Sequence, residues 1–169
     1  TNFLNNKFIL DTSANYIIQN DKNMVSQGQY FNPLTSLYLF PRGEDFSDVA
    51  VYERYDDLSG VNTQYWPYGD LGGVSSQNPY WIMNRMNREN DRRRYKLAAS
   101  LQYNIIEGLN VQGRVSIDNT ESKYTEKFHA GTVGNFAGPK GRYKEENRLD
   151  RQVYADVLAN FNKTFNEFN

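Results

Sequence analysis

The sequence contains no cysteine and a single histidine, His129. Without cysteine the chain can form neither a disulfide framework nor a thiolate zinc site, and one histidine cannot build a multi-histidine metal centre. Lys and Arg number 19 against 20 Asp and Glu, giving a formal net charge of −1 and none of the strong basicity typical of nucleic-acid binding. We therefore expect no metal, no cofactor and no nucleic-acid partner.

Long apolar runs are also missing. No stretch approaches the ~20 apolar residues that a membrane-spanning helix needs. The N-terminus also lacks the basic and then apolar segments that are typical of a signal peptide. Neither absence excludes a β-barrel, because the strands of a barrel alternate between apolar and polar residues and average out on a hydropathy scale. A segment from the middle of a longer chain remains equally compatible with them.

Four segments alternate with period two, as expected of strands that have two different faces. We predict strands over 6–19, 95–106, 109–123 and 150–162. In the third, Leu109, Val111 and Val115 share a face, while Asn110 and Gln112 lie on the other. All four reach the ~9–11 residues of a transmembrane strand, whereas a globular strand commonly has ~5–6.

The predicted connections are unequal in length. Glu107 and Gly108 form a tight-turn dipeptide between the second and third strands. Two long loops, roughly 20–94 and 124–149, lie between the other strands. Outer-membrane barrels combine short turns at one end with long external loops at the other. Since four strands cannot close a barrel, the pattern predicts an all-β fold: an antiparallel transmembrane β-barrel segment of four long strands and two extracellular loops.

The two faces of these strands receive different predicted roles. The apolar face would contact lipid and comprises Leu97, Ala99, Leu101, Leu109, Val111, Val115, Ile117, Val153, Val157 and Phe161. The polar face would point into the lumen and comprises Asp11, Asn15, Lys96, Gln102, Asn104, Gln112, Arg114 and Asp118. The lumen-facing residues would line a hydrated passage or contact a plug. An ordinary solvated sheet face is the alternative.

The first long loop is rich in aromatic residues. We identify seven as candidates for binding a substrate or partner: Tyr30, Phe31, Tyr38, Trp66, Tyr68, Tyr80 and Trp81. Flat rings offer stacking surface, and tyrosine and tryptophan add a polar group. The same rings could instead form a small core that orders the loop, or pack on a partner protein. The sequence leaves these three roles open.

Signals for catalysis are weak, and we expect no enzyme. Adjacent acids such as Asp56 and Asp57 would point to opposite faces of a strand. The glycine-rich stretch 131–141 lacks the G-K-[ST] ending of a phosphate-binding loop. The run Arg92-Arg93-Arg94 could meet lipopolysaccharide phosphates electrostatically. A solvated strand end is the simpler interpretation of that run.

Four blocks together resemble the SusC/RagA-like TonB-dependent outer-membrane transporters of Bacteroidetes. They are YFNPLTSLYLFPRGEDF (30–46), QNPYWIMNRMNREN (77–90), LNVQGRVSID (109–118) and DVLANFNKTF (156–165). The resemblance implies an internal segment of a barrel of about 22 strands, with the plug domain and its TonB-contacting box absent from this chain.

The same resemblance implies a location in the outer membrane and TonB-dependent import of glycans or peptides. Its expected partners are a SusD-like surface lipoprotein, TonB through the missing plug region, membrane lipid and the glycan or peptide substrate. The alternative is a soluble all-β carbohydrate-binding module, in which the apolar face would pack on a second sheet.

Overall fold

A computed structural model of the chain describes residues 1–4, 7–69 and 76–163. Strands make up 57% of the structure and its two α-helices are short, which confirms the predicted all-β class. Within the described residues the main sheet is antiparallel and open. No helix in this part of the chain is long and apolar enough to cross a membrane.

The chain divides into two compact units. The first, here called the strand unit, consists of Thr1–Gln19, Arg92–Ser122 and Arg148–Asn169. The second, the loop unit, consists of Asn20–Asp91 and Lys123–Asn147. The long strands contribute residues to both units, and the contacts within each unit are described separately below.

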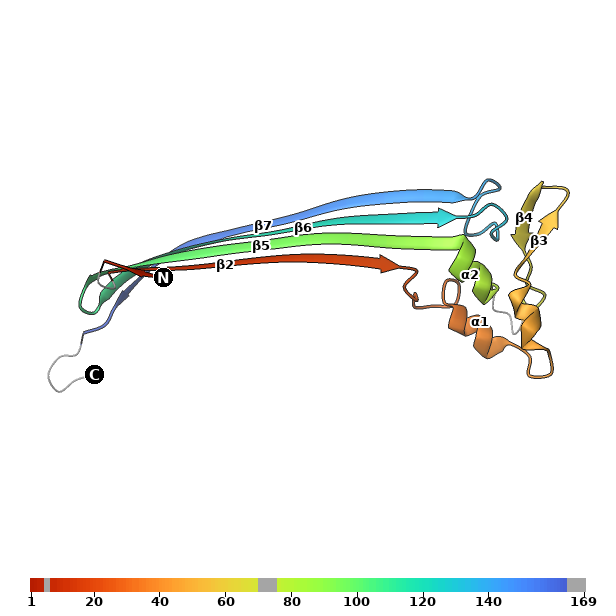
Figure 1. The fold of residues 1–169 in the computed structure, drawn as a ribbon, viewed down its shortest axis with the longest axis horizontal. Helices are drawn as coiled ribbons and strands as arrows, with labels where there is room; N and C mark the ends of the chain where they lie inside the picture. Colours follow the sequence, from red (N-terminus) through yellow and green to blue (C-terminus); the bar gives the residue numbers. More distant parts are fainter. Residues whose placement is uncertain (5–6, 70–75, 164–169) are drawn as a thin grey trace. The chain divides into compact units, whose positions relative to one another are not determined.

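The main sheet has five strands in the order β1-β2-β5-β6-β7 (Figure 1). They are β1 (Asn2–Phe3), β2 (Phe8–Lys22), β5 (Met86–Ile106), β6 (Leu109–Phe128) and β7 (Arg142–Phe161). The first strand is a two-residue segment paired antiparallel with the start of β2. The four long strands correspond to the four predicted from the period-two pattern.

These strands are longer than predicted, so the loops predicted at 20–94 and 124–149 were wrong at their ends. β5 begins at Met86 rather than 95, β6 continues to Phe128 and β7 begins at Arg142. The added segments are rich in charge and lack apolar alternation, which is why the pattern missed them. Cross-strand ion pairs support them instead: Lys22 Nζ lies 3.5 Å from Glu89 Oε1, and Lys123 Nζ lies 3.2 Å from Glu145 Oε1. Asn6, the first residue of the first predicted strand, lies outside the described residues.

In the strand unit, the two faces of the sheet carry different side chains. Arg114 binds Asp156 across β6 and β7, and Asn160 Nδ2 donates to Asn110 Oδ1 at 3.1 Å on the same face. The apolar face includes Leu101, Val115 and Val157, whose exposed fractions are 47%, 45% and 75%. The buried hydrophobic residues of the described chain all belong to the loop unit. No second layer within the described strand unit therefore covers its apolar face.

The loop unit contains the shorter elements. They are α1 (Pro33–Leu39), a 3-10 helix η1 (Phe46–Ala50), the antiparallel hairpin β3 (Glu53–Asp56) and β4 (Val61–Gln64), and α2 (Pro79–Arg85). Both α-helices begin with an asparagine cap followed by proline. Asn32 Oδ1 accepts from the Leu34 N–H at 3.0 Å, and Asn78 Oδ1 accepts from the Tyr80 N–H at 2.9 Å. Proline suits the next position because its φ is already helical and its missing N–H is not needed there.

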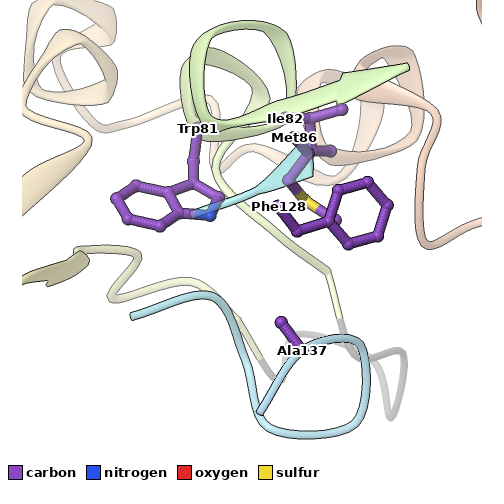
Figure 2. Close-up of a cluster of buried hydrophobic side chains, with 5 residues drawn as sticks. All are labelled: Trp81, Ile82, Met86, Phe128 and Ala137. Carbon is purple, nitrogen blue, oxygen red and sulfur yellow. The ribbon is translucent and has the colours of Figure 1, made fainter. Parts of the chain in front are cut away.

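A small hydrophobic core holds the loop unit together (Figure 2). It consists of Trp81, Ile82, Met86, Phe128 and Ala137. Phe31, Tyr52 and Phe136 pack against it and are half-buried. The core joins α2 to β5, β6 and the loop after β6, so these segments form one packed unit.

The turn between β5 and β6 lies at Glu107 and Gly108, as predicted. Gly108 has φ +81°, a conformation that glycine adopts without the steric cost borne by other residues. Its carbonyl accepts from the Asn162 N–H at 2.7 Å. A Cβ at this position would lie 2.0 Å from the carbonyl oxygen of Asn162. Both the backbone angle and the neighbouring strand therefore require glycine.

We expect Gly108→Ala to lower the free energy of unfolding by about 1–2 kcal/mol from the left-handed backbone alone, with the clash adding to it. Gly113→Ala is the control, because Gly113 has no positive φ and a Cβ there meets no atom within 4 Å. Denaturant titration of both variants measures the difference. Equal stabilities for the two variants would contradict this account of the turn.

Candidate functional site

The polar face of the strand unit carries the eight residues predicted to face a lumen, and several of them form small, separate groups of polar contacts. Arg94 donates from Nε to Asp118 Oδ1 at 2.8 Å and from Nη2 to Asp118 Oδ2 at 2.5 Å. Gln102 Nε2 donates to Asn104 Oδ1 at 2.9 Å. Arg114 binds both carboxylate oxygens of Asp156. Asn15, Lys96 and Gln112 lie on the same face by strand alternation.

Asp11, the eighth predicted residue, lines a shallow hollow of about 350 Å³ on this face together with Arg114 and Tyr154. Small side chains, including Ser13, Ala98 and Ser116, also line the hollow. Tyr154 Oη donates to Asp156 Oδ2 at 2.5 Å, so the carboxylate of Asp156 fixes both the guanidinium and the phenol. The hollow thus has a wall of fixed polar groups around small residues.

The predicted lumen-facing residues did not include three members of these groups: Arg94, Tyr154 and Asp156. Arg94 has the same strand parity as Lys96 and Gln102, so continuing the alternation into the arginine run would have placed it on the polar face. Asp156 and Tyr154 also follow the parity of Gln152 on the fourth strand. The pairing of Arg114 with Asp156 needed the register between β6 and β7, which alternation alone does not supply.

The structure separates the aromatic candidates into groups rather than joining them in one site. Trp66 and Tyr68 cluster with Phe40 and Phe46, with ring centroids 5.2 Å apart for Trp66–Tyr68 and 5.1 Å for Phe40–Tyr68. Trp66 Nε1 donates to Ser76 Oγ at 2.9 Å. Burial is the largest cause of a raised Tyr68 pKa, with Glu44 and Asp48 adding to it.

Tyr30 and Phe31 belong to a second group. Their rings contact Phe136 at centroid distances of 5.1 and 5.2 Å, and the Arg88 guanidinium lies 5.3 Å from the centre of the Phe31 ring. Arg88 also donates to Ser26 Oγ and to the Met24 and Phe31 carbonyls. Arg88, on β5, therefore holds the segment that carries Tyr30 and Phe31 against that strand.

The remaining three candidates differ strongly in accessibility. Tyr80 stacks on Tyr52 with centroids 6.4 Å apart, and Tyr38 is 90% exposed on α1. Trp81 is fully buried, and its Nε1 donates to Thr132 Oγ1 at 3.1 Å. A buried ring has no face to offer a ligand, so the placement of Trp81 among binding residues was wrong. It belongs to the core that orders the loop, one of the roles left open by the sequence.

Buried polar side chains connect the segments of the loop unit, and sequence reasoning did not single them out. Asn78 Nδ2 donates to the Val49 carbonyl at 2.9 Å and to the Tyr65 carbonyl at 3.2 Å, while its N–H donates to Gln64 Oε1 at 2.8 Å. Ser36 Oγ donates to the Gln77 carbonyl at 2.5 Å. The Asn-Pro dipeptide at the start of α2 was the available signal, because asparagine is a preferred helix cap.

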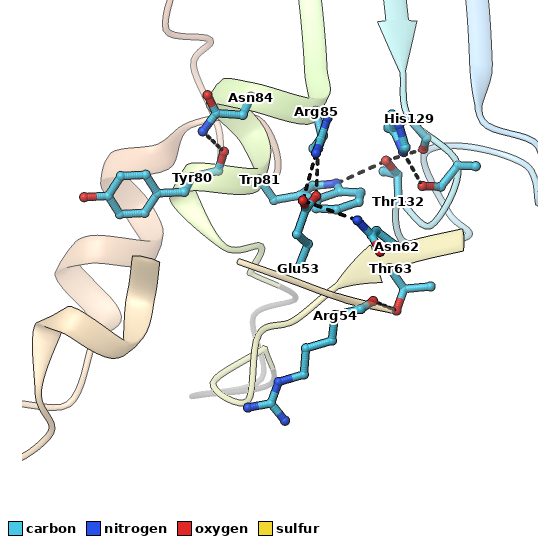
Figure 3. Close-up of polar contacts among 11 residues, drawn as sticks. Glu53, Arg54, Asn62, Thr63, Tyr80, Trp81, Asn84, Arg85, His129 and Thr132 are labelled. Carbon is cyan, nitrogen blue, oxygen red and sulfur yellow. Dashed lines mark hydrogen bonds and ion pairs between the residues drawn. The ribbon is translucent and has the colours of Figure 1, made fainter. Parts of the chain in front are cut away.

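An ion pair joins the hairpin β3–β4 to α2 (Figure 3). Arg85 donates from Nε to Glu53 Oε2 and from Nη2 to Glu53 Oε1, each at 2.8 Å. The exposed fractions of the Arg85 and Glu53 side chains are 31% and 23%. The hydrogen bonds from Arg85 lower the pKa of Glu53, partly opposed by burial, and Arg85 and His129 add Coulombic attraction.

His129 lies exposed beside this pair, with its ring edge-on to Trp81 at a centroid distance of 6.1 Å. Its Nδ1 lies 2.9 Å from the Ala130 carbonyl, a local contact within the loop. Across residues 1–4, 7–69 and 76–163, no group of three His, Cys, Asp or Glu side chains is placed to hold a metal ion. The charged groups here form structural pairs between neighbouring segments.

The chain matches no family model, and the search of the curated proteins found no match to it.

We expect Glu53→Gln to lower the free energy of unfolding by roughly 1–2 kcal/mol at neutral pH. This effect is smaller than for a fully buried ion pair, because both side chains remain partly exposed. Since the folded state lowers the pKa of Glu53, the contribution is present above the ordinary carboxyl pKa of about 4.3 and is lost as pH falls through the lowered value. The gap between wild type and Glu53→Gln should therefore narrow below about pH 5.

Unfolding titrations across this pH range measure the gap. Asp57→Asn is the control, because Asp57 is exposed and no ion pair to it is found among the described residues. If the difference in free energy of unfolding between wild type and Glu53→Gln does not change with pH, the Glu53–Arg85 contact does not stabilise the fold through its charges.

Proposed function

We propose that this chain is a segment of a transmembrane antiparallel β-barrel in an outer-membrane nutrient importer of the SusC/RagA-like, TonB-dependent kind. The observation that carries the proposal is the uncovered apolar face of the strand unit. Leu101, Val115 and Val157 are exposed there, while the hydrophobic core forms elsewhere, in the loop unit. A contiguous exposed apolar surface marks a face that meets another apolar phase or partner.

Strand length supports lipid as that phase. The long strands contain 15, 21, 20 and 20 residues, each more than the ~9–11 that cross a bilayer. Tyr103 stacks on Phe8 with centroids 4.6 Å apart, and Tyr95 lies eight positions away on the same face of β5. At ~3.3 Å per residue this separation is about 26 Å, close to the ~25 Å apolar band bracketed by aromatic girdles.

The opposite face suits the wall of a hydrated lumen. Two pairs of opposite charge, Arg114–Asp156 and Arg94–Asp118, lie on this face and remain partly exposed. Transmembrane barrels place polar residues inside and apolar residues outside along each strand. In the proposed transporter this wall borders the passage and contacts the plug.

The loop unit would lie at the external mouth of the barrel. Its hydrophobic core holds the long segment between β2 and β5 in a fixed fold. Tyr30, Tyr38 and Phe46 remain exposed and are available to contact cargo or a SusD-like lipoprotein. Exposed aromatic rings stack on sugars and on peptide side chains alike. The proposed transport cycle is capture of a glycan or peptide outside, TonB-driven movement of the plug, and passage along the polar wall.

Lysine substitutions on the two faces test the proposal. Leu101→Lys and Val115→Lys should each lower folding stability in lipid by ~2–4 kcal/mol if they lie at the bilayer midplane. Gln112→Lys is the matched control, because it lies on β6 like Val115 but on the polar face, and it should have a much smaller effect. Folding assays in lipid vesicles give the measurement.

Two results would argue against membrane placement. One is equal tolerance of lysine on both faces. The other is a chain that stays soluble and monomeric without detergent, which would favour the soluble carbohydrate-binding module instead.

A further inference from the structure

The apolar face of the strand unit carries two arginines at one end. On β5, Arg93 precedes Tyr95 by two residues and therefore shares its face; on β7, Arg151 precedes Val153 in the same way. Both are exposed. Arg94 lies on the opposite face, where it binds Asp118, so the arginine run divides between the two faces. We call Arg93, Asn119 and Arg151 the arginine rim.

Asn119 is the buried member of the arginine rim. It is 0% exposed, and its Oδ1 accepts from Arg151 Nε at 3.1 Å. Its Nδ2 is buried and has no hydrogen-bond partner in the described structure. A buried donor without an acceptor is unfavourable and rare in folded proteins. The buried Asn119 holds the guanidinium of Arg151 from below, through the hydrogen bond to its Oδ1.

A shallow apolar hollow lies next to the arginine rim on this face. Its volume is about 330 Å³, and its lining includes Thr12, Ala14, Leu97, Ala99, Val115 and Ile117. Thr12, Ala14 and Ala99 are small, while Leu97, Val115 and Ile117 stand higher around them. Ile117 precedes Asn119 by two residues on β6, so the hollow begins about 7 Å along the strand from the rim.

A guanidinium pair beside an apolar hollow matches an amphipathic ligand with an anionic head and a hydrocarbon tail. We propose that the strand unit holds a membrane lipid, with its phosphate on Arg93 and Arg151, the latter held by Asn119, and an acyl chain in the hollow. The inference rests on the proposed membrane function. Arginine suits this role because its planar fork of N–H groups binds two phosphate oxygens at once.

Acidic side chains on the same face oppose this binding, among them Asp91, which precedes Arg93 by two residues on β5 and is exposed. Glu121 follows Asn119 by two residues on β6, lies on the same face and is exposed. Its carboxylate repels a phosphate and so opposes the attraction of the two arginines. Removing that charge should therefore strengthen lipid binding, which gives the proposal a variant that acts in the opposite direction.

The test uses the protein reconstituted in phosphatidylcholine vesicles that contain spin-labelled phosphatidylglycerol or spin-labelled phosphatidylcholine. Electron paramagnetic resonance gives the association constant of each lipid with the protein. We expect wild type to prefer phosphatidylglycerol, and each of Arg93→Gln and Arg151→Gln to reduce that preference by about fivefold. Glu121→Gln should increase it. Arg148→Gln is the matched control, because Arg148 is exposed on β7 but binds Asp150 on the polar face.

Three outcomes would overturn the lipid site. These are equal association of both lipids with wild type, an equal loss in Arg148→Gln and Arg151→Gln, and displacement of the lipid by inorganic phosphate alone. In each case the protein still inserts, and the proposed function stands. Failure of wild type to associate with either labelled lipid would instead count against the proposed membrane function itself.

Discussion

The strand unit depends on one constraint: successive side chains of a strand point to opposite faces, so register decides which chemistry each face presents. Arg114 meets Asp156, Asn110 meets Asn160 and Asn119 meets Arg151 in a single register between β6 and β7. A slip by one residue would move Arg114 to the apolar face and Val115 to the polar one. The ion pairs and hydrogen bonds between the strands therefore specify the sorting of the two surfaces as well as contributing to stability.

The loop unit is ordered by different means. Burial of Trp81, Met86 and Phe128 supplies its apolar core, and Asn78 links its segments through backbone carbonyls. A long excursion between strands would otherwise expose many unpaired backbone groups, which is unfavourable in a folded protein. The described residues of the strand unit, by contrast, include no buried hydrophobic side chain. The binding function proposed for the loop unit rests on the aromatic rings that stay exposed outside its core, such as Tyr30 and Tyr38.

The sequence predicted the strands wherever side-chain alternation accompanied them. The turn at Gly108 and the polar assignment of Arg114 and Asp118 followed from local pattern, because period two and turn chemistry act over a few residues. The extension of β5 back to Met86 did not, since its charged residues are held by cross-strand partners that lie far away in the sequence. Trp81 was misplaced for a related reason: an aromatic residue in a loop looks alike whether it faces solvent or a core, and only tertiary packing distinguishes the two.

β7 stands at one end of the strand order, with β6 as its neighbour among the described strands. Its other long edge presents a row of backbone N–H and C=O groups over a strand of 20 residues. Such an edge is a template for further strand addition, and Val153, Val157 and Phe161 beside it are exposed. We expect this edge to pair with another strand, and two copies of the chain to pair through it where no other strand does.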